Sequence, residues 1–130
     1  MVIHETARAV RVEDNTLSRA GRGISILADK SQPPEDIWVE NNRVRDIRNL
    51  PEGNGQGIRV AGARNVKVVG NTVEGCASYA LMLAADSVAI SGLDVRDNTV
   101  RGGSSALLLR LGEARYRPGL VLQRNHYALG

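Results

Sequence analysis

The chain has 130 residues and a formal net charge of +3, with 17 Lys and Arg scattered among 14 Asp and Glu. This length suits one domain, and so mild a charge argues against nucleic acid, which favours a concentrated basic stripe with stacking aromatics. No apolar run is long enough to span a membrane, and no signal peptide opens the sequence. The single cysteine, Cys76, excludes an internal disulfide and is expected to be a small buried hydrophobe.

Apolar and polar residues alternate in short segments, which predicts strands with one buried face. In chain order we expect strands near residues 1–3, 10–12, 15–17, 24–26, 37–39, 42–44, 58–60, 66–68, 71–73, 81–83, 93–95, 98–100, 107–109, 120–122 and 125–127. The apolar residues are mostly small and branched, without any Phe, and suit a narrow interior between stacked strands.

Five asparagines recur among these segments at steps of 27, 29, 27 and 27 residues. Each has an apolar residue five positions before it, another three before it and a third two after it. The five are Asn15, Asn42, Asn71, Asn98 and Asn125. A fixed period of this size predicts stacked structural repeats, with three short strands in each coil.

The recurring asparagine has a physical reason. The bend between the second and third strands of a coil needs a left-handed residue, and Asn tolerates that region better than other non-glycine residues. Stacked at strand spacing, about 4.8 Å, the five side-chain amides are expected to hydrogen-bond to one another as a ladder.

Longer connections interrupt the regular coils. They span residues 28–36, 48–56 and 86–92. In the last of them, Val88 and Ile90 are expected to form an extra short strand. Such insertions gather as loops on one or two faces of a stacked-coil protein, often on the binding face.

Two segments, Gly57–Val60 and Asn65–Val73, resemble the repeats of right-handed parallel β-helices. Those repeats belong to the pectate-lyase-like superfamily, which includes alginate and pectate lyases, epimerases and tailspikes. The resemblance covers almost the whole chain and implies an all-β, right-handed parallel β-helix (a solenoid) of about five coils. It also implies an acidic polysaccharide as ligand, bound along the first-strand sheet, and an extracellular or cell-surface location.

The catalytic signatures of that superfamily are absent from the sequence. No aspartate cluster marks the first-strand face, so no cofactor follows from the residues, and calcium is implied by the resemblance alone. The Asp-Pro-His motif of alginate epimerases and the aspartate set of polygalacturonases are also missing. If the chain is an enzyme, the resemblance implies a polysaccharide lyase or epimerase.

Opposite charges fall at equivalent positions of neighbouring coils. The expected pairs are Lys67 with Asp94, Arg45 with Glu74, and Glu74 with Arg101. Such pairs stabilise the stacking of coils by a few tenths of a kcal/mol each.

The candidate ligand site lies where the 48–56 insertion meets the first strand of the third coil. Its residues are Arg59, Arg110, Glu52 and Asn54, with His4 at the end of the groove. An arginine there would bind a uronate carboxylate through two hydrogen bonds. The alternative is that all five are ordinary surface residues, and no catalytic residue is assigned. The other histidine, His126, lies four coil spacings from His4, which excludes a shared metal site.

Three large apolar side chains are expected to point outward, Met82 and Leu108 from the first-strand sheet and Trp38 from the second. Exposed groups of this kind mark a partner surface or a surface covered by a loop, and Trp38 also suits a sugar platform. Neither end of the stack carries a capping helix. We therefore expect a single domain over residues 1–130 that is a fragment of a longer β-helix protein. We also expect self-association through the open ends or the Met82/Leu108 strip.

Two functions remain open on these observations. The first is a polysaccharide-associated β-helix module, from a polyuronate lyase or epimerase. The second is a non-enzymatic structural or adhesive module, such as a stalk or a segment of a surface protein. The insertions beside Arg59 favour the first, and the scarcity of aromatic residues favours the second.

Overall fold

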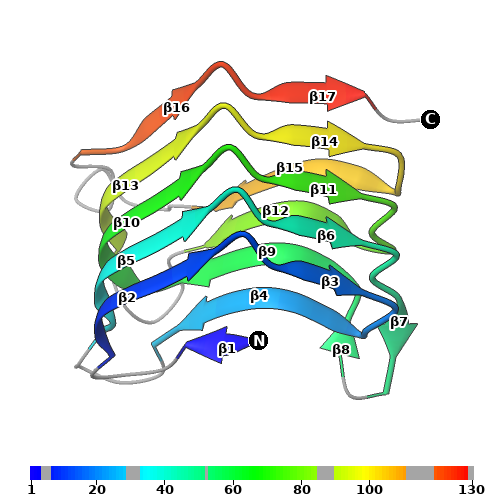
Figure 1. Cartoon of the computed structure of the whole chain (residues 1–130), viewed down its shortest axis with the longest axis horizontal. Helices are drawn as coiled ribbons and strands as arrows, with labels where there is room; N and C mark the ends of the chain where they lie inside the picture. The colour runs from blue at the N-terminus through cyan, green and yellow to red at the C-terminus, as the bar shows by residue number, and fades with distance from the viewer. Residues whose placement is uncertain (4–6, 29–32, 52, 85–89, 111–118, 129–130) are drawn as a thin grey trace.

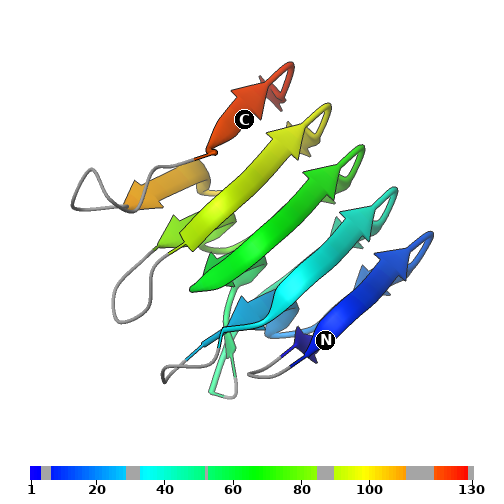
Figure 2. The same cartoon turned by 90° about the vertical axis from the view of Figure 1, so that its left-hand side faces the viewer.

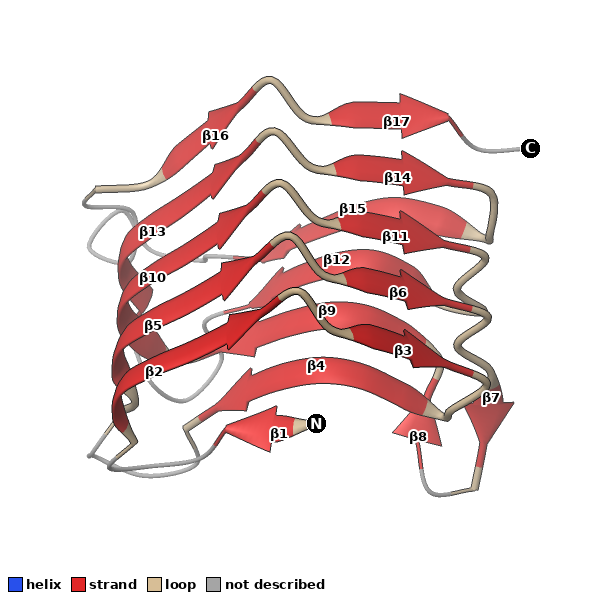
Figure 3. Ribbon diagram, in the orientation of Figure 1, coloured by secondary structure: helices blue, strands red, loops and turns tan. Residues whose placement is uncertain are grey.

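The computed structural model describes residues 1–3, 7–28, 33–51, 53–84, 90–110 and 119–128, without the side chains of 107–110. Its strands form three parallel sheets that wind around one core, and the chain visits the sheets in turn (Figures 1 and 3). Figure 2 shows the equivalent strands lying side by side in successive coils. A short antiparallel hairpin, β7 (Asn49–Leu50) and β8 (Gly53–Asn54), projects from one corner.

Within the described residues, each parallel sheet has five strands. The first sheet contains β1 (Val2–Ile3), β4 (Arg22–Leu27), β9 (Gln56–Ala61), β12 (Tyr79–Ala84) and β15 (Ser105–Arg110). The second contains β2 (Arg8–Glu13), β5 (Glu35–Glu40), β10 (Ala63–Val69), β13 (Ile90–Arg96) and β16 (Val121–Gln123). The third contains β3 (Thr16–Ser18), β6 (Arg43–Arg45), β11 (Thr72–Glu74), β14 (Thr99–Arg101) and β17 (His126–Ala128). This topology confirms the predicted β-solenoid, with three strands per coil.

Two predicted details of the insertions are wrong. Part of residues 48–56 forms the β7–β8 hairpin rather than a plain loop. Ile90 does not start an extra strand, because it opens β13 and pairs with Ala63 of β10 in the regular second sheet. Val88 lies outside the described residues.

The core is a stack of mostly branched apolar side chains from all three sheets. Ile58 of the first sheet, Val66 of the second and Val73 of the third have no exposed surface. Cys76 belongs to the same core and is 2% exposed, which confirms the sequence prediction. Burial raises the pKa of its thiol to about 11. A buried thiol with so high a pKa carries almost no nucleophilic thiolate at neutral pH.

The five asparagines form one continuous ladder. Each of the first four donates its Nδ2 to the Oδ1 of the next asparagine, at 2.9 to 3.1 Å. The backbone N–H of each of these four also donates to that same Oδ1. From Asn42 onward, Nδ2 donates in addition to a carbonyl of the preceding coil. The ladder prediction is confirmed, with Asn71 1% exposed and Asn98 fully buried.

The prediction that the ladder asparagine itself is the left-handed residue of the bend is wrong by one position. The left-handed residue is the one that precedes each ladder asparagine: Asp14, Asn41, Gly70, Asp97 and Arg124, with φ between 53° and 67°. A left-handed residue there turns the following N–H toward the amide of the next coil. The asparagine is therefore required for its side-chain hydrogen bonds rather than for its own backbone conformation.

Candidate functional site

The structure describes the predicted ligand site only in part. Arg59, on β9, is half-buried, and its Nε is buried without a hydrogen-bond partner among the described residues. Asn54 is exposed on the β8 hairpin strand, where its backbone pairs with Asn49. The backbone of Arg110 pairs with Ala84 on β12, so one strand separates Arg110 from Arg59.

The remaining predicted site residues, His4 and Glu52, lie outside the described residues, as does the side chain of Arg110. A shared ligand site for the five residues therefore stays a prediction.

The outer face of the first sheet offers little exposed surface among the described residues. Ser25 is 1% exposed, Met82 is 7% exposed and Ala84 is fully buried. Gln56 Nε2 also donates to Met82 Sδ at 3.1 Å. The expected exposure of Met82 is therefore wrong, because neighbouring groups cover the side chain. The side chain of Leu108 lies outside the described part, and self-association stays a prediction.

Trp38 points outward from the second sheet, as predicted, and lies in a column between two cations. The Arg11 guanidinium carbon is 4.6 Å from the ring centroid, and Lys67 Nζ is 5.8 Å from it. These residues come from the strands on either side of β5. A cation–π contact stabilises by about 0.5–1 kcal/mol at an exposed site. Trp38 therefore binds the first three coils together, which leaves less of its ring for a sugar.

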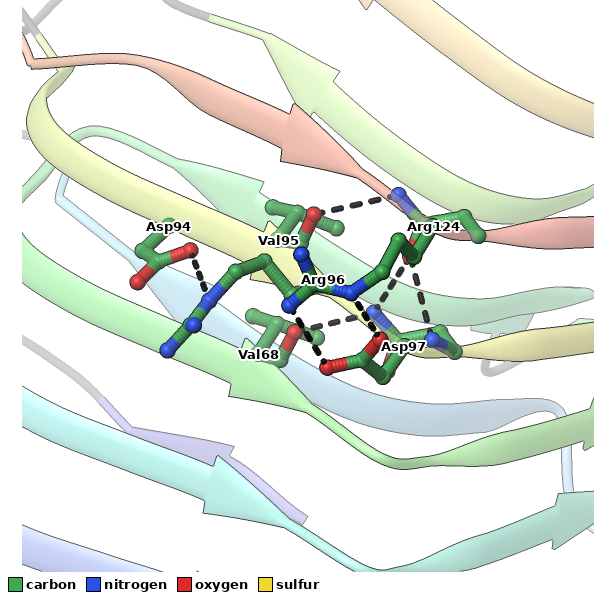
Figure 4. Close-up of polar contacts among 8 residues, drawn as sticks. Val68, Asp94, Val95, Arg96, Asp97 and Arg124 are labelled. Carbon is green, nitrogen blue, oxygen red and sulfur yellow. Dashed lines mark hydrogen bonds and ion pairs between the residues drawn. The ribbon is translucent and has the colours of Figure 1, made fainter.

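Other charged residues of the second sheet, and of the bend that follows it, form ion pairs with one another. Arg96 Nε lies 2.8 Å from Asp94 Oδ1, and Arg124 Nε lies 2.7 Å from Asp97 Oδ1 (Figure 4). Arg8 forms an ion pair with Glu35 across β2 and β5. The predicted Lys67–Asp94 pair is wrong, because Asp94 contacts Arg96 on its own strand and Lys67 contacts Trp38.

The third sheet and the corner after it carry an excess of positive charge. Five exposed arginines project there: Arg19, Arg43, Arg45, Arg48 and Arg101. Only two carboxylates, Asp46 and Glu74, accompany them among the described residues of this region. We call these five arginines the arginine face. The sequence analysis did not predict the arginine face, because Arg45 and Arg101 were considered only as ion-pair partners of Glu74. The signal was present, since the outward positions of the third strands include three arginines and one acid.

Two hollows flank the arginine face. One, of about 370 Å³, is lined by Ser18, Arg19, Arg45 and Asp46. The other, of about 450 Å³, is lined by Thr99, Val100, Arg101, His126, Tyr127 and Ala128. The strand β11, which carries Glu74, lies between them in the third sheet. The face thus has a hollow at each end and an acid in the middle.

Arg48 holds Asp46 at the first hollow through two hydrogen bonds, Nε to Oδ1 at 3.3 Å and Nη2 to Oδ2 at 2.9 Å. The hydrogen bond from Arg48 is the main cause that lowers the pKa of Asp46, and the charges of Arg19 and Arg45 add to it. Asp46 is thus hydrogen-bonded to Arg48, and the two arginines that line this hollow are Arg19 and Arg45.

Calcium, which the resemblance implies, finds no site in the part of the chain that the structure describes. No group of three His, Cys, Asp or Glu side chains gathers there. None of the described residues forms a helix with the length and apolar character needed to cross a membrane.

Three parallel sheets around one core, with a buried asparagine ladder, define this protein as a parallel β-helix. A family model described as "Right handed beta helix region" matches residues 2–127, so the chain belongs to the right-handed β-helix family. Comparisons with curated proteins and with solved structures gave no match.

Proposed function

We propose that the chain is a polysaccharide-binding β-helix module that binds an anionic polysaccharide, such as a polyuronate, on its third sheet. The observation that carries this proposal is the arginine face, with five exposed guanidinium groups and only two carboxylates. Guanidinium binds carboxylate with two parallel hydrogen bonds, which gives both affinity and orientation. The pectate-lyase-like resemblance agrees with this class of ligand.

The rigidity of the face supports the same proposal. Arg43 and Arg45 project from β6 and Arg101 from β14, and both strands pair with β11 between them. The backbone positions of these arginines are therefore held at multiples of the strand spacing, about 4.8 Å. A polymer with regularly spaced carboxylates can contact several of these arginines without reorganisation of the backbone.

The described residues support binding better than catalysis. A lyase or an epimerase needs a base beside the bound uronate. Asp46 is the carboxylate at the first hollow, but its lowered pKa makes it a weak base. A polyuronate lyase or epimerase activity is thus the less supported form of this proposal.

A structural or adhesive module is the second candidate. The observation that favours it is the continuity of the ladder and of the Arg11–Trp38–Lys67 column, which stiffen the stack without serving a ligand. An adhesive module that binds a surface polysaccharide would combine the two candidates.

Isothermal titration calorimetry with polygalacturonate and alginate measures the affinity that tests the proposal, and a neutral glucan is the ligand control. We expect binding that weakens with added salt, because exposed charges are screened. Arg45→Gln should weaken it about tenfold, the effect of losing one charge-assisted hydrogen bond. Arg64→Gln is the matched control, because Arg64 is an exposed arginine on the second sheet.

Equal affinity of the two variants, or no binding of either polyanion, would refute the proposal. Release of unsaturated products in the same mixtures, with calcium supplied, would show a lyase instead.

A further inference from the structure

We propose that Glu74 divides the arginine face into two anion subsites, so that the face selects oligosaccharides long enough to reach both hollows. This inference rests on the proposed function and concerns the same surface. It specifies the length of the ligand and the residue that sets it.

The contacts of Glu74 carry the inference. Its Oε1 lies 3.6 Å from Arg43 Nη2 and 3.9 Å from Arg101 Nη1. These arginines belong to β6 and β14, the strands on either side of β11. One carboxylate oxygen is therefore shared by two guanidinium groups from different coils. These contacts confirm the predicted Glu74–Arg101 pair, whereas Arg43 takes the place predicted for Arg45.

Burial distinguishes Glu74 from the arginines that it joins. Its side chain is 25% exposed, against 54% for Arg43 and 65% for Arg101. The carboxylate thus lies low in the middle of the face, with the arginines above it. A ligand carboxylate that bridged Arg43 and Arg101 would need this same position. Glu74 occupies the position itself and repels a second negative charge there.

The two hollows remain open to anions on either side of Glu74. The first contains Arg19 and Arg45, at the first and second coils, and the second contains Arg101 and His126, at the fourth and fifth coils. Their centres are about three strand spacings apart, on the order of 14 Å. An oligouronate that spans this distance binds both hollows, and the second contact is then intramolecular.

This arrangement makes affinity depend on length in a stepwise way. A short oligouronate binds one hollow only, whereas one that reaches both gains affinity through the effective concentration of its second end. Replacing Glu74 with Gln keeps the side-chain shape and frees Arg43 and Arg101 in the middle of the face. Short oligomers can then bind there, and the step in affinity moves to shorter chains.

Isothermal titration of an oligogalacturonate series, from the monosaccharide upward, tests this inference with the wild-type chain, Glu74→Gln and Glu40→Gln. Glu40 is the matched control, because it lies on the second sheet, is 26% exposed and has an arginine partner, Arg11, at 4.0 Å. Both substitutions remove one negative charge. Circular dichroism confirms that each variant is folded.

We expect Glu74→Gln to bind the shortest oligomers about tenfold more tightly than the wild-type chain, with little change for Glu40→Gln. The wild-type chain should show one steep rise in affinity with length. Equal gains for the two variants, or an even increase per sugar in the wild-type chain, would overturn the two-subsite inference while leaving the proposed function in place.

No binding by any variant would instead overturn the proposed function. A single-stranded homopolymeric RNA that binds as tightly as the oligogalacturonates, with the same dependence on Glu74, would overturn the choice of polysaccharide.

Discussion

Replacing Asn71 with Ala should destabilise the protein strongly, because this side chain is the buried centre of the ladder. Its Nδ2 donates to the Val39 carbonyl and to Asn98 Oδ1, each at 2.9 Å. Its Oδ1 accepts the backbone N–H and the Nδ2 of Asn42, at 2.9 and 3.0 Å. Truncation leaves the Val39 carbonyl and two N–H groups of Asn42 without these partners. The affected site is almost inaccessible to water, since Asn71 is 1% exposed and Asn42 is 2% exposed.

Each buried polar group that loses its partner costs about 1–3 kcal/mol. Partial relaxation makes these costs less than additive, so we expect a loss of roughly 3–6 kcal/mol for Asn71→Ala. That loss is a large share of the 5–15 kcal/mol typical of a folded domain. Urea unfolding followed by circular dichroism measures it.

Asn15→Ala is the control for Asn71→Ala. Asn15 is half-buried in the first coil and donates to Asn42 Oδ1, but no ladder asparagine of a preceding coil donates to it. Its truncation should cost about 1 kcal/mol, the worth of an ordinary hydrogen bond. A similar cost for the two variants would refute the ladder as the main source of this stability.

Three further predictions concern single sites. Gly57→Ala should destabilise by about 1–3 kcal/mol in the same urea assay, because an added Cβ would lie 2.6 Å from the carbonyl oxygen of Ala80; an unchanged midpoint would contradict that packing. Cys76, with a pKa of about 11, should resist a thiol reagent at neutral pH in the folded protein and react after denaturation; prompt reaction in the folded protein would contradict its burial. The hydrogen bond from Arg124 lowers the pKa of Asp97. The pair therefore stabilises the fold fully above the ordinary aspartate pKa, about 3.9. This stabilisation is lost as the pH falls through the lowered pKa. In Arg124→Gln, the NMR titration midpoint of Asp97 should rise toward that ordinary value, and an unmoved midpoint would exclude Arg124 as the cause.

The fold could be predicted from the sequence because the ladder asparagine and its flanking apolar residues recur in every coil. Each ladder rung uses the asparagine amide, which donates and accepts along one column from a short side chain, and the apolar residues around it are fixed by the pleat. The left-handed position was placed wrongly by one residue, because Asp14, Gly70 and Arg124 share no single residue type. Only the repeated φ value in the structure relates them.

The candidate site could be predicted less well, because surface partners depend on the reach of side chains. Alternation predicted that Glu74 and its neighbours point outward, but the choice of Arg43 over Arg45 as its partner follows from side-chain geometry. The burial of Met82 likewise depends on what covers the first sheet, which periodicity does not report. The resemblance to the pectate-lyase-like superfamily predicted a ligand site on the first sheet and gave no reason to expect one on the third.

The bonds between the ladder amides all have the same direction, since each of the first four asparagines donates its Nδ2 to the Oδ1 of the asparagine in the following coil. The amide dipoles therefore add along the axis, and each hydrogen bond polarises the next. Every rung offers its neighbours the same acceptor and the same donors, so one whole coil can be removed or duplicated and the junction still matches. The length of such a stack can change during evolution in steps of a complete coil. Loss of half a coil would remove strands from some sheets and not from others, and would move the following asparagines out of the column.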